Sequence, residues 1–308
     1  MDAPYGGRLM AVTIHDGQHE SLARSRARNV RDALQEDIGH QDWTALLIAP
    51  DTQASAQLRV RDSAVLCGTQ WFDDCVRALD PSAMIQWHAR DGDRLLPDTV
   101  ICDLTANARA LLTAERSAMN FLQLLSATAT LTRRYVQAIA TASPNPTGCA
   151  VLDTRKTIPG LRQAQKYAVR VGGGTNQRLA LWDGILIKEN HIMAAGGVTQ
   201  ALQAADALNA AVPIQIEVEN LDELQEALSA GATSILLDNF SMDDMREAVR
   251  ITAGQALLEA SGGITLESIA EIARTGVDRI SVGQLTKDIQ AVDYSLRVTA
   301  RNGDKTVG

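Results

Sequence analysis

Residues 224–238 read LQEALSAGATSILLD, and residues 269–283 read IAEIARTGVDRISVG. In each stretch apolar residues recur at helical spacing, a glycine follows where the helix would end, and a short aliphatic run typical of a buried strand comes next. The same helix, glycine and strand therefore occur twice in the same order. This repetition favours a β/α barrel over a single nucleotide-binding crevice between two strands.

The alternation of strands and helices extends from about residue 150 to residue 283. Two helix starts are marked by a polar residue with an acidic residue three positions later, Asn220 with Glu223 and Ser241 with Asp244. The spacing leaves room for one helix between successive strands, as a parallel sheet requires. The expected strands are residues 151–152, 185–187, 214–218, 235–237, 257–258 and 280–282.

The part of the chain before residue 150 is organised differently. Residues 21–38 place apolar side chains on one stripe of an amphipathic helix that Gly39 ends. Residues 57–61 and 85–88 alternate between apolar and polar side chains, which is typical of strands in a half-buried sheet. Residues 107–142 contain neither glycine nor proline and predict a long connecting helix. We therefore expect a small α+β domain ahead of the barrel.

Composition narrows the functional class. The chain has 308 residues and a formal net charge of −8, which argues against a general role on nucleic acids or anionic membranes. Its cysteines form no C-x-x-C pair, no apolar run approaches the roughly 20 residues of a membrane span, and the first residues do not have the pattern of a secretion signal. We expect a cytoplasmic protein that binds neither nucleic acid nor membranes.

Polar or small residues follow each expected strand of the barrel. Catalytic groups of β/α barrels lie at the carboxyl ends of different strands, so these residues predict an active site there. Exposed strand ends are often polar for no functional reason, but this explanation is weaker for the whole series. The residues concerned are Arg155, Lys156, Lys188, Glu189, Glu217, Glu219, Asp238, Asn239, Ser261 and Gly283.

Residues 213–219 add the expectation of charge inside the barrel. With a period of two, the aliphatic side chains face the helices, and Gln215, Glu217 and Glu219 face the interior. A buried carboxylate needs a partner, and Lys156, Lys188 or a bound metal are the candidates. The result is either a structural ion-pair cluster or a functional site.

Glycine-rich turns and cations on the same rim indicate an anion. Backbone N–H groups at residues 172–174, 262–263 and 283 could bind phosphate oxygens, although glycines also end helices and make tight turns. Arg155 and Arg178 suit carboxylates or phosphates. Mg²⁺ would need few protein ligands beside a pyrophosphate, and Glu217 and Asp238 are the candidates. The remaining rim candidate, His191, we interpret as structural.

Several stretches resemble quinolinate phosphoribosyltransferase, also called nicotinate-nucleotide pyrophosphorylase (carboxylating), of the bacterial type. The resemblance covers nearly the whole chain after about residue 25. It rests on DTRKTIPGLR at residues 153–162, KYAV at 166–169 with GGG at 172–174, LIKENH at 186–191, LDNF at 237–240 and ISVG at 280–283, and it extends to ALQEDIG at 33–39, ER at 115–116 and NFL at 120–122.

The resemblance implies an α/β fold class, an incomplete (open) β/α barrel with an N-terminal α+β sandwich domain. It places the sandwich domain at residues 1–118, the barrel catalytic domain at 119–283, and a tail of residues 284–308 back on the first domain. It also implies a homodimer or larger homo-oligomer. In that assembly Arg116 reaches the active site of the partner subunit.

The implied reaction converts quinolinate and phosphoribosyl pyrophosphate to nicotinate mononucleotide, pyrophosphate and CO2 in NAD biosynthesis, with Mg²⁺ as cofactor. The catalytic residues would be Lys156, Lys188, Glu217 and Asp238, the last two also metal ligands, if only through bound pyrophosphate. The other substrate-binding residues would be Arg116, Thr154, Arg155, Gln177, Arg178, Ser261, Gly262, Gly263, Gly283 and Lys287. The pyridine nitrogen attacks, so no protein nucleophile is needed.

The chain departs from the family pattern at one position. Where the family has Gly-Gly-Gly-x-Asn-His-Arg, residues 172–178 read GGGTNQR, so Gln177 replaces a histidine. An amide still donates a hydrogen bond to a carboxylate but cannot become cationic. We expect activity to be retained without the pH dependence of that histidine.

Three other functions fit part of the pattern. A Schiff-base aldolase or lyase would use Lys188 as its nucleophile. A close relative could act on nicotinate or another pyridine acid. A module that only binds a phosphate ligand would have no use for Glu217 and Asp238, which makes it the weakest alternative.

Overall fold

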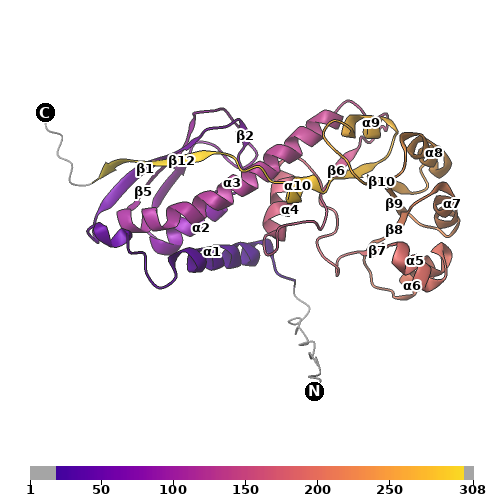
Figure 1. Ribbon diagram of the computed structural model, residues 1–308, viewed down its shortest axis with the longest axis horizontal. Coiled ribbons are helices and arrows are strands. Elements are labelled where there is room, and N and C mark those ends of the chain that lie inside the picture. Colours follow the sequence, from indigo (N-terminus) through magenta and orange to yellow (C-terminus); the bar gives the residue numbers. More distant parts are fainter. Residues whose placement is uncertain (1–18, 302–308) are drawn as a thin grey trace, which may run out of the picture.

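The computed structural model describes residues 19–301. The start of the expected first domain, residues 1–18, and the last residues of the expected tail, 302–308, lie outside the described residues. Two β-sheets with separate hydrophobic cores lie at opposite ends of the long axis of the molecule (Figure 1).

The first sheet has four strands in the order β12-β1-β5-β3 and is antiparallel throughout. Strand β12 of this sheet comes from the carboxyl-terminal segment, so the chain returns to its first sheet after completing the second. A short two-stranded sheet, β2 with β4, lies beside it. The elements of this half are α1 (Leu22–Ile38), η1 (Ala45–Leu47), β1 (Gln53–Val60), β2 (Ala64–Val65), α2 (Thr69–Leu79), β3 (Met84–Trp87), β4 (Arg94–Leu95), β5 (Val100–Asn107) and β12 (Tyr294–Arg301).

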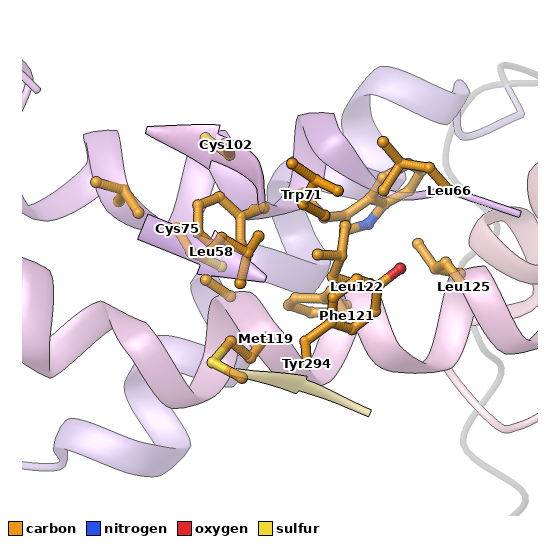
Figure 2. Close-up of a cluster of buried hydrophobic side chains, with 14 of the residues drawn as sticks. Leu58, Leu66, Trp71, Cys75, Cys102, Met119, Phe121, Leu122, Leu125 and Tyr294 are labelled. Carbon is orange, nitrogen blue, oxygen red and sulfur yellow. The ribbon is translucent and has the colours of Figure 1, made fainter. Parts of the chain in front are cut away.

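Helix α3 (Ala108–Ile139) joins the two halves, as its uninterrupted sequence predicted. Asn107 begins the helix by accepting hydrogen bonds from the backbone N–H groups of Arg109 and Ala110. The amino-terminal part of α3 packs in the first core, where Leu122 and Leu125 lie among Leu58, Trp71 and other buried side chains (Figure 2). Its last turns, with Tyr135 and Ile139, belong to the second core.

The second sheet has six parallel strands in the order β6-β11-β10-β9-β8-β7. Helices pack around its outside, and β6 and β7 are edge strands, so the barrel is open between them as expected (Figure 1). Its elements are β6 (Ala150–Leu152), α4 (Arg162–Val171), β7 (Ile185–Ile187), α5 (Glu189–Ala195), α6 (Val198–Ala207), β8 (Ile214–Val218), α7 (Leu221–Ser229), β9 (Ser234–Asp238), α8 (Met242–Thr252), β10 (Leu257–Ser261), α9 (Ile269–Arg274), β11 (Arg279–Ser281) and α10 (Gln284–Lys287).

Alternation along the strands separates the helix-facing side from the interior. Ile216 and Val218 of β8 and Leu258 of β10 are buried in the core beneath the helices. Their neighbours Gln215 and Glu217 face the other way, into the open barrel, as the period of two predicted. The barrel interior is therefore lined partly by polar side chains.

Candidate active site

A cavity of about 590 Å³ lies at the carboxyl ends of the barrel strands. The structure brings together there the predicted site residues except Arg116, Glu189 and Glu219. The cavity is lined by Thr154, Arg155, Lys156, Gln177, Arg178, Leu186, Lys188, Glu217, Leu236, Asp238, Asn239, Glu259, Ser261, Gly262, Gly263, Ile264, Ser281, Gly283, Gln284 and Lys287.

Glu217 and Lys188 form an ion pair on one wall of this cavity. Glu217 is 9% exposed, and the Nζ atom of Lys188 donates to its Oε2 at 2.7 Å and its Oε1 at 3.1 Å. This confirms Lys188 as the partner that the buried carboxylate required. Asp238, half-buried at the end of the neighbouring strand β9, accepts a hydrogen bond from Asn239 at 2.9 Å.

Two guanidinium groups, those of Arg155 and Arg178, also line this cavity. The Nε atom of Arg155 is buried and has no hydrogen-bond partner among the described residues, while Arg178 donates to the carbonyl of Gly184 at 3.0 Å. Burial lowers the pKa of Arg178, and the charge of Arg155 lowers it further. The cations are close enough to repel each other, so an anion placed between them would be stabilised by both.

Small residues form the floor where β10 and β11 end. Gly262 has φ +108, and a side chain at that position would collide with the side-chain oxygen of Asn239. The adjacent backbone at Gly263 and Gly283 lines the cavity together with Ser261. Lys287, exposed at the end of α10, brings a further positive charge to this side.

Two of the expectations about the rim are wrong. Glu219 is exposed rather than inside the barrel, because β8 ends at Val218 and the period of two no longer applies beyond that residue. A hydrogen bond with Glu189, and the like charge of that residue, raise the pKa of Glu219. The glycines at 172–174 do not line the cavity. A side chain at Gly172 would come within 2.6 Å of the carbonyl oxygen of Ala129, so this turn serves close packing on α3.

Arg116 lies apart from these residues. It is exposed on α3 and lines a separate cavity of about 400 Å³ beside Asp32, Glu36 and Asp37 of α1. The two cavities share no lining residue. Within one protomer, Arg116 is therefore not part of the barrel rim.

A buried ion pair that was not predicted holds the loop carrying Gln177 and Arg178. The Nζ atom of Lys166 donates to Asp153 Oδ1 at 2.5 Å and to the Gln177 carbonyl at 2.8 Å, and both charged side chains are at most 1% exposed. Asp153 also accepts from the side chain of Asn176 at 2.6 Å and from the Gln177 N–H at 2.9 Å. The sequence signal was a lysine beside the alanines and valine of a helix that packs against its neighbours.

Burial is the largest influence on both pKa values of this pair. It raises the pKa of Asp153 and lowers that of Lys166, while the opposite charge of each partner counteracts the effect. The donors around Asp153 favour its ionised form. The charged pair therefore holds the loop of residues 175–178 in place through these hydrogen bonds.

His191 has the structural role expected of it. Its Nδ1 atom accepts a hydrogen bond from the backbone N–H of Lys188 at 3.0 Å and so caps the first turn of α5. The described residues contain no group of three or more His, Cys, Asp or Glu side chains placed to hold a metal ion. In the same part of the chain, no helix is long and apolar enough to span a membrane.

Comparison with known proteins gives consistent matches. Residues 42–126 match the model of the quinolinate phosphoribosyl transferase N-terminal domain, and residues 128–297 match that of its C-terminal domain. The probable nicotinate-nucleotide pyrophosphorylase [carboxylating] of Bacillus subtilis is 40% identical over 268 residues, which cover 87% of this chain and 91% of that protein. The corresponding enzyme of Mycobacterium leprae is 39% identical over 277 residues, 87% of this chain and 95% of that one.

Solved structures agree with the sequence matches. The nicotinate-nucleotide pyrophosphorylase of Francisella tularensis superposes with a TM-score of 0.85 at 45% identity, covering 89% of this chain and 96% of that chain. A Streptococcus pyogenes structure also reaches a TM-score of 0.85, at 34% identity, covering 92% of this chain and all of that one (100%).

Proposed function

The chain belongs to the quinolinate phosphoribosyltransferase family, and on that premise we propose how its own residues divide the work of the reaction. The enzyme is a nicotinate-nucleotide diphosphorylase (carboxylating) that makes nicotinate mononucleotide in NAD biosynthesis. Its substrates are quinolinate and phosphoribosyl pyrophosphate.

The observation that supports the assignment of roles is a pair of guanidinium groups, those of Arg155 and Arg178, neither of which forms an ion pair within the described part of the chain. Quinolinate has carboxylates on adjacent ring carbons, and Arg155 and Arg178 supply two planar cations that line the cavity and lie close enough to influence each other. The buried, unpartnered Nε of Arg155 is a donor that such a carboxylate satisfies. Gln177, beside Arg178, offers a neutral hydrogen bond where the family has a histidine.

The other charged and small residues of the cavity suit phosphoribosyl pyrophosphate. Lys156, Lys188 and Lys287 neutralise its phosphates, and Thr154, Ser261, Gly262, Gly263 and Gly283 contact them through hydroxyl and backbone groups. Glu217 and Asp238 lie where they can bind the ribose hydroxyls and stabilise positive charge that develops at the anomeric carbon. Lys188 keeps the Glu217 carboxylate in place before substrate binds.

The chemistry then needs positioning and electrostatics more than proton transfer by the protein. The pyridine nitrogen forms a bond to the anomeric carbon as the bond to pyrophosphate breaks, and the electron pair of that bond leaves with pyrophosphate. The pyridinium formed accepts the electrons of the adjacent carbon–carboxylate bond as CO2 departs, and that ring carbon then takes up a proton. Holding both substrates in one cavity accelerates the first step.

We propose Mg²⁺ as the cofactor that accompanies phosphoribosyl pyrophosphate. Glu217 and Asp238 fit this ion, because Mg²⁺ held mainly by pyrophosphate oxygens needs only one or two protein carboxylates. When bound, the ion neutralises charge on the departing pyrophosphate.

The remaining proposals concern assembly and location. We propose a homodimer or larger homo-oligomer in which Arg116 completes the active site of the partner subunit. We also assign residues 1–118 and the tail 284–308 to one domain and residues 119–283 to the other, supported by the pairing of β12 with β1. The four cysteines are free thiols, which fits a cytoplasmic location.

The assay for this function is release of labelled CO2 from carboxyl-labelled quinolinate. We expect release to require phosphoribosyl pyrophosphate and Mg²⁺, and to be matched by pyrophosphate. The variant Arg178→Ala should lower kcat/KM for quinolinate about a hundredfold, since a charge-assisted hydrogen bond contributes about 1.5–3 kcal/mol. Arg250→Ala, which removes a cation from the exposed last turn of α8, is the matched control.

Three outcomes would contradict the proposed function. Turnover of nicotinate, or of another pyridine acid, in preference to quinolinate would assign a different substrate. Borohydride-dependent attachment of a carbonyl substrate to Lys188 would indicate Schiff-base chemistry. Tight binding of phosphoribosyl pyrophosphate without any turnover would leave only a binding protein.

A further inference from the structure

A row of hydrogen-bonded side chains crosses the interior of the open barrel and ends at Gln177. The Nε2 atom of Gln177 donates to Oε1 of Gln215 at 2.8 Å, and the Nε2 atom of Gln215 donates to Oε2 of Glu259 at 2.8 Å. Gln215 and Glu259 lie on β8 and β10 and are 8% and 1% exposed. These three side chains form what we call the interior relay.

The relay divides the barrel interior. Gln177 and Glu259 line both the active-site cavity and a second cavity of about 510 Å³, whose walls include the amino-terminal ends of the strands. Closed β/α barrels usually fill this layer with branched aliphatic side chains. An unsatisfied buried polar group is costly, and among the described residues Oε1 of Glu259 has no hydrogen-bond partner, so its Oε2 depends on the donor that Gln215 provides.

The carboxylate of Glu259 determines which atoms of the relay donate hydrogen bonds and which accept them. An amide presents either its oxygen or its nitrogen, but an ionised carboxylate only accepts hydrogen bonds. Glu259, with the guanidinium of Arg279 at 3.9 Å, therefore requires the nitrogen of Gln215. The oxygen of Gln215 is then left to accept from the nitrogen of Gln177. Glu259 thus determines which end of the Gln177 amide faces Gln215.

The backbone of Gln177 is fixed independently of the relay. Its N–H donates to Asp153 at 2.9 Å and its carbonyl accepts from Lys166 at 2.8 Å. Only the side chain of Gln177 therefore depends on Gln215 and Glu259. This separation makes it possible to disturb the amide without moving the loop that carries Arg178.

We propose that Glu259 is a positioning residue that acts through Gln215 to fix the Gln177 amide against bound quinolinate. The proposal rests on the proposed function, in which Gln177 contacts a carboxylate of that substrate. A family member with a cationic histidine has charge to hold its substrate at this position. In this chain the contact is a neutral amide. One N–H of its Nε2 donates to Gln215, so the second N–H is the group that donates to a substrate carboxylate.

The test is Gln215→Met, which keeps the length and charge of the side chain but removes its acceptor and donor. We expect KM for quinolinate to rise about three- to tenfold, the range of one neutral hydrogen bond, and KM for phosphoribosyl pyrophosphate to stay within about twofold. Glu259→Gln should give a smaller change in the same direction. Both effects should vanish in a Gln177→Ala background, because the residue through which they act is then gone.

Gln57→Met is the matched control, since Gln57 also donates to a carboxylate, that of Asp103 in the first sheet, at 2.8 Å. It should leave both KM values unchanged. Thermal unfolding shows whether Gln215→Met folds, and Glu259→Gln provides the same test if it does not. Equal increases in both KM values, or increases that persist in Gln177→Ala, would overturn the relay. A parent enzyme that releases no CO2 from quinolinate would instead overturn the proposed function.

Discussion

Asp153 shows how one buried side chain determines the position of several site residues. It accepts hydrogen bonds from Lys166, Asn176 and the backbone of Gln177, and it has no exposed surface (0%). Asp153→Asn leaves the Lys166 ammonium buried without a counter-ion. We therefore expect the free energy of unfolding to fall by about 3–5 kcal/mol, measured by urea denaturation.

Asp243→Asn is the control for that substitution. Asp243 pairs with Arg246 on the surface of α8, where its side chain is 94% exposed. The same chemical change should alter stability much less there, since exposed pairs are screened by solvent. Equal losses of unfolding free energy in the two variants would show that the buried Asp153–Lys166 pair stabilises the fold no more than an exposed pair does.

At this scale the sequence was informative about side chains within strands and uninformative about contacts between distant elements. Glu217 was placed correctly because alternation along β8 depends only on neighbouring residues. Glu219 was misplaced because nothing in residues 213–219 marks where the strand stops. Glu259 and Arg279 were missed because their partners lie on other strands, and which strands are neighbours depends on the sheet order.

At the scale of elements, the turn after α4 depends on how closely it approaches α3. Gly172 has an ordinary helical conformation, with φ −68, so its backbone does not require glycine. An added Cβ would lie 2.6 Å from both the Ala129 carbonyl oxygen and the Thr132 Cβ. Gly172→Ala should therefore push α4 from α3 and lower the free energy of unfolding by about 1–3 kcal/mol, the range for overpacking.

Gly196→Ala is the control, because it strains the backbone without creating a steric overlap. Gly196 has φ +92, and an added Cβ there would meet no atom within 4 Å, so its substitution costs conformational energy alone. We expect Gly172→Ala also to raise KM for quinolinate, because the same turn leads to Gln177 and Arg178, and Gly196→Ala to leave that KM unchanged. A Gly172→Ala enzyme with unaltered KM would show that the loop tolerates displacement of α4.

The order and type of the barrel elements were predictable because helix caps, glycine stops and aliphatic runs are local signals. Asn220 and Ser241 cap helices where the sequence indicated, and six parallel strands form at the expected runs. The role of the triple glycine was not predictable. A glycine needed for close packing on α3 and a glycine that binds phosphate look alike until the fold brings α3 and α4 together.

At the scale of the whole molecule, the barrel rim of one protomer lacks a predicted cation. Arg116 lines a cavity on the α1 and α3 side of the molecule that shares no residue with the active-site cavity. If Arg116 binds quinolinate, it must do so in a second protomer. Each active site would then contain residues of both subunits, which is possible where two subunits share a symmetric interface.

Mixed dimers test this arrangement. Arg116→Ala and Asp238→Asn should each be nearly inactive alone, but a dimer with one subunit of each has one intact site. Random assembly should restore about a quarter of wild-type turnover, because half of the dimers are mixed and half of their sites are complete. The reciprocal experiment pairs wild type with the double variant Arg116→Ala/Asp238→Asn. That mixed dimer should be inactive if Arg116 acts across the interface, and half as active as wild type if Arg116 acts within its own subunit. Two different affinity tags allow the mixed dimer to be purified, and its turnover then distinguishes the two arrangements.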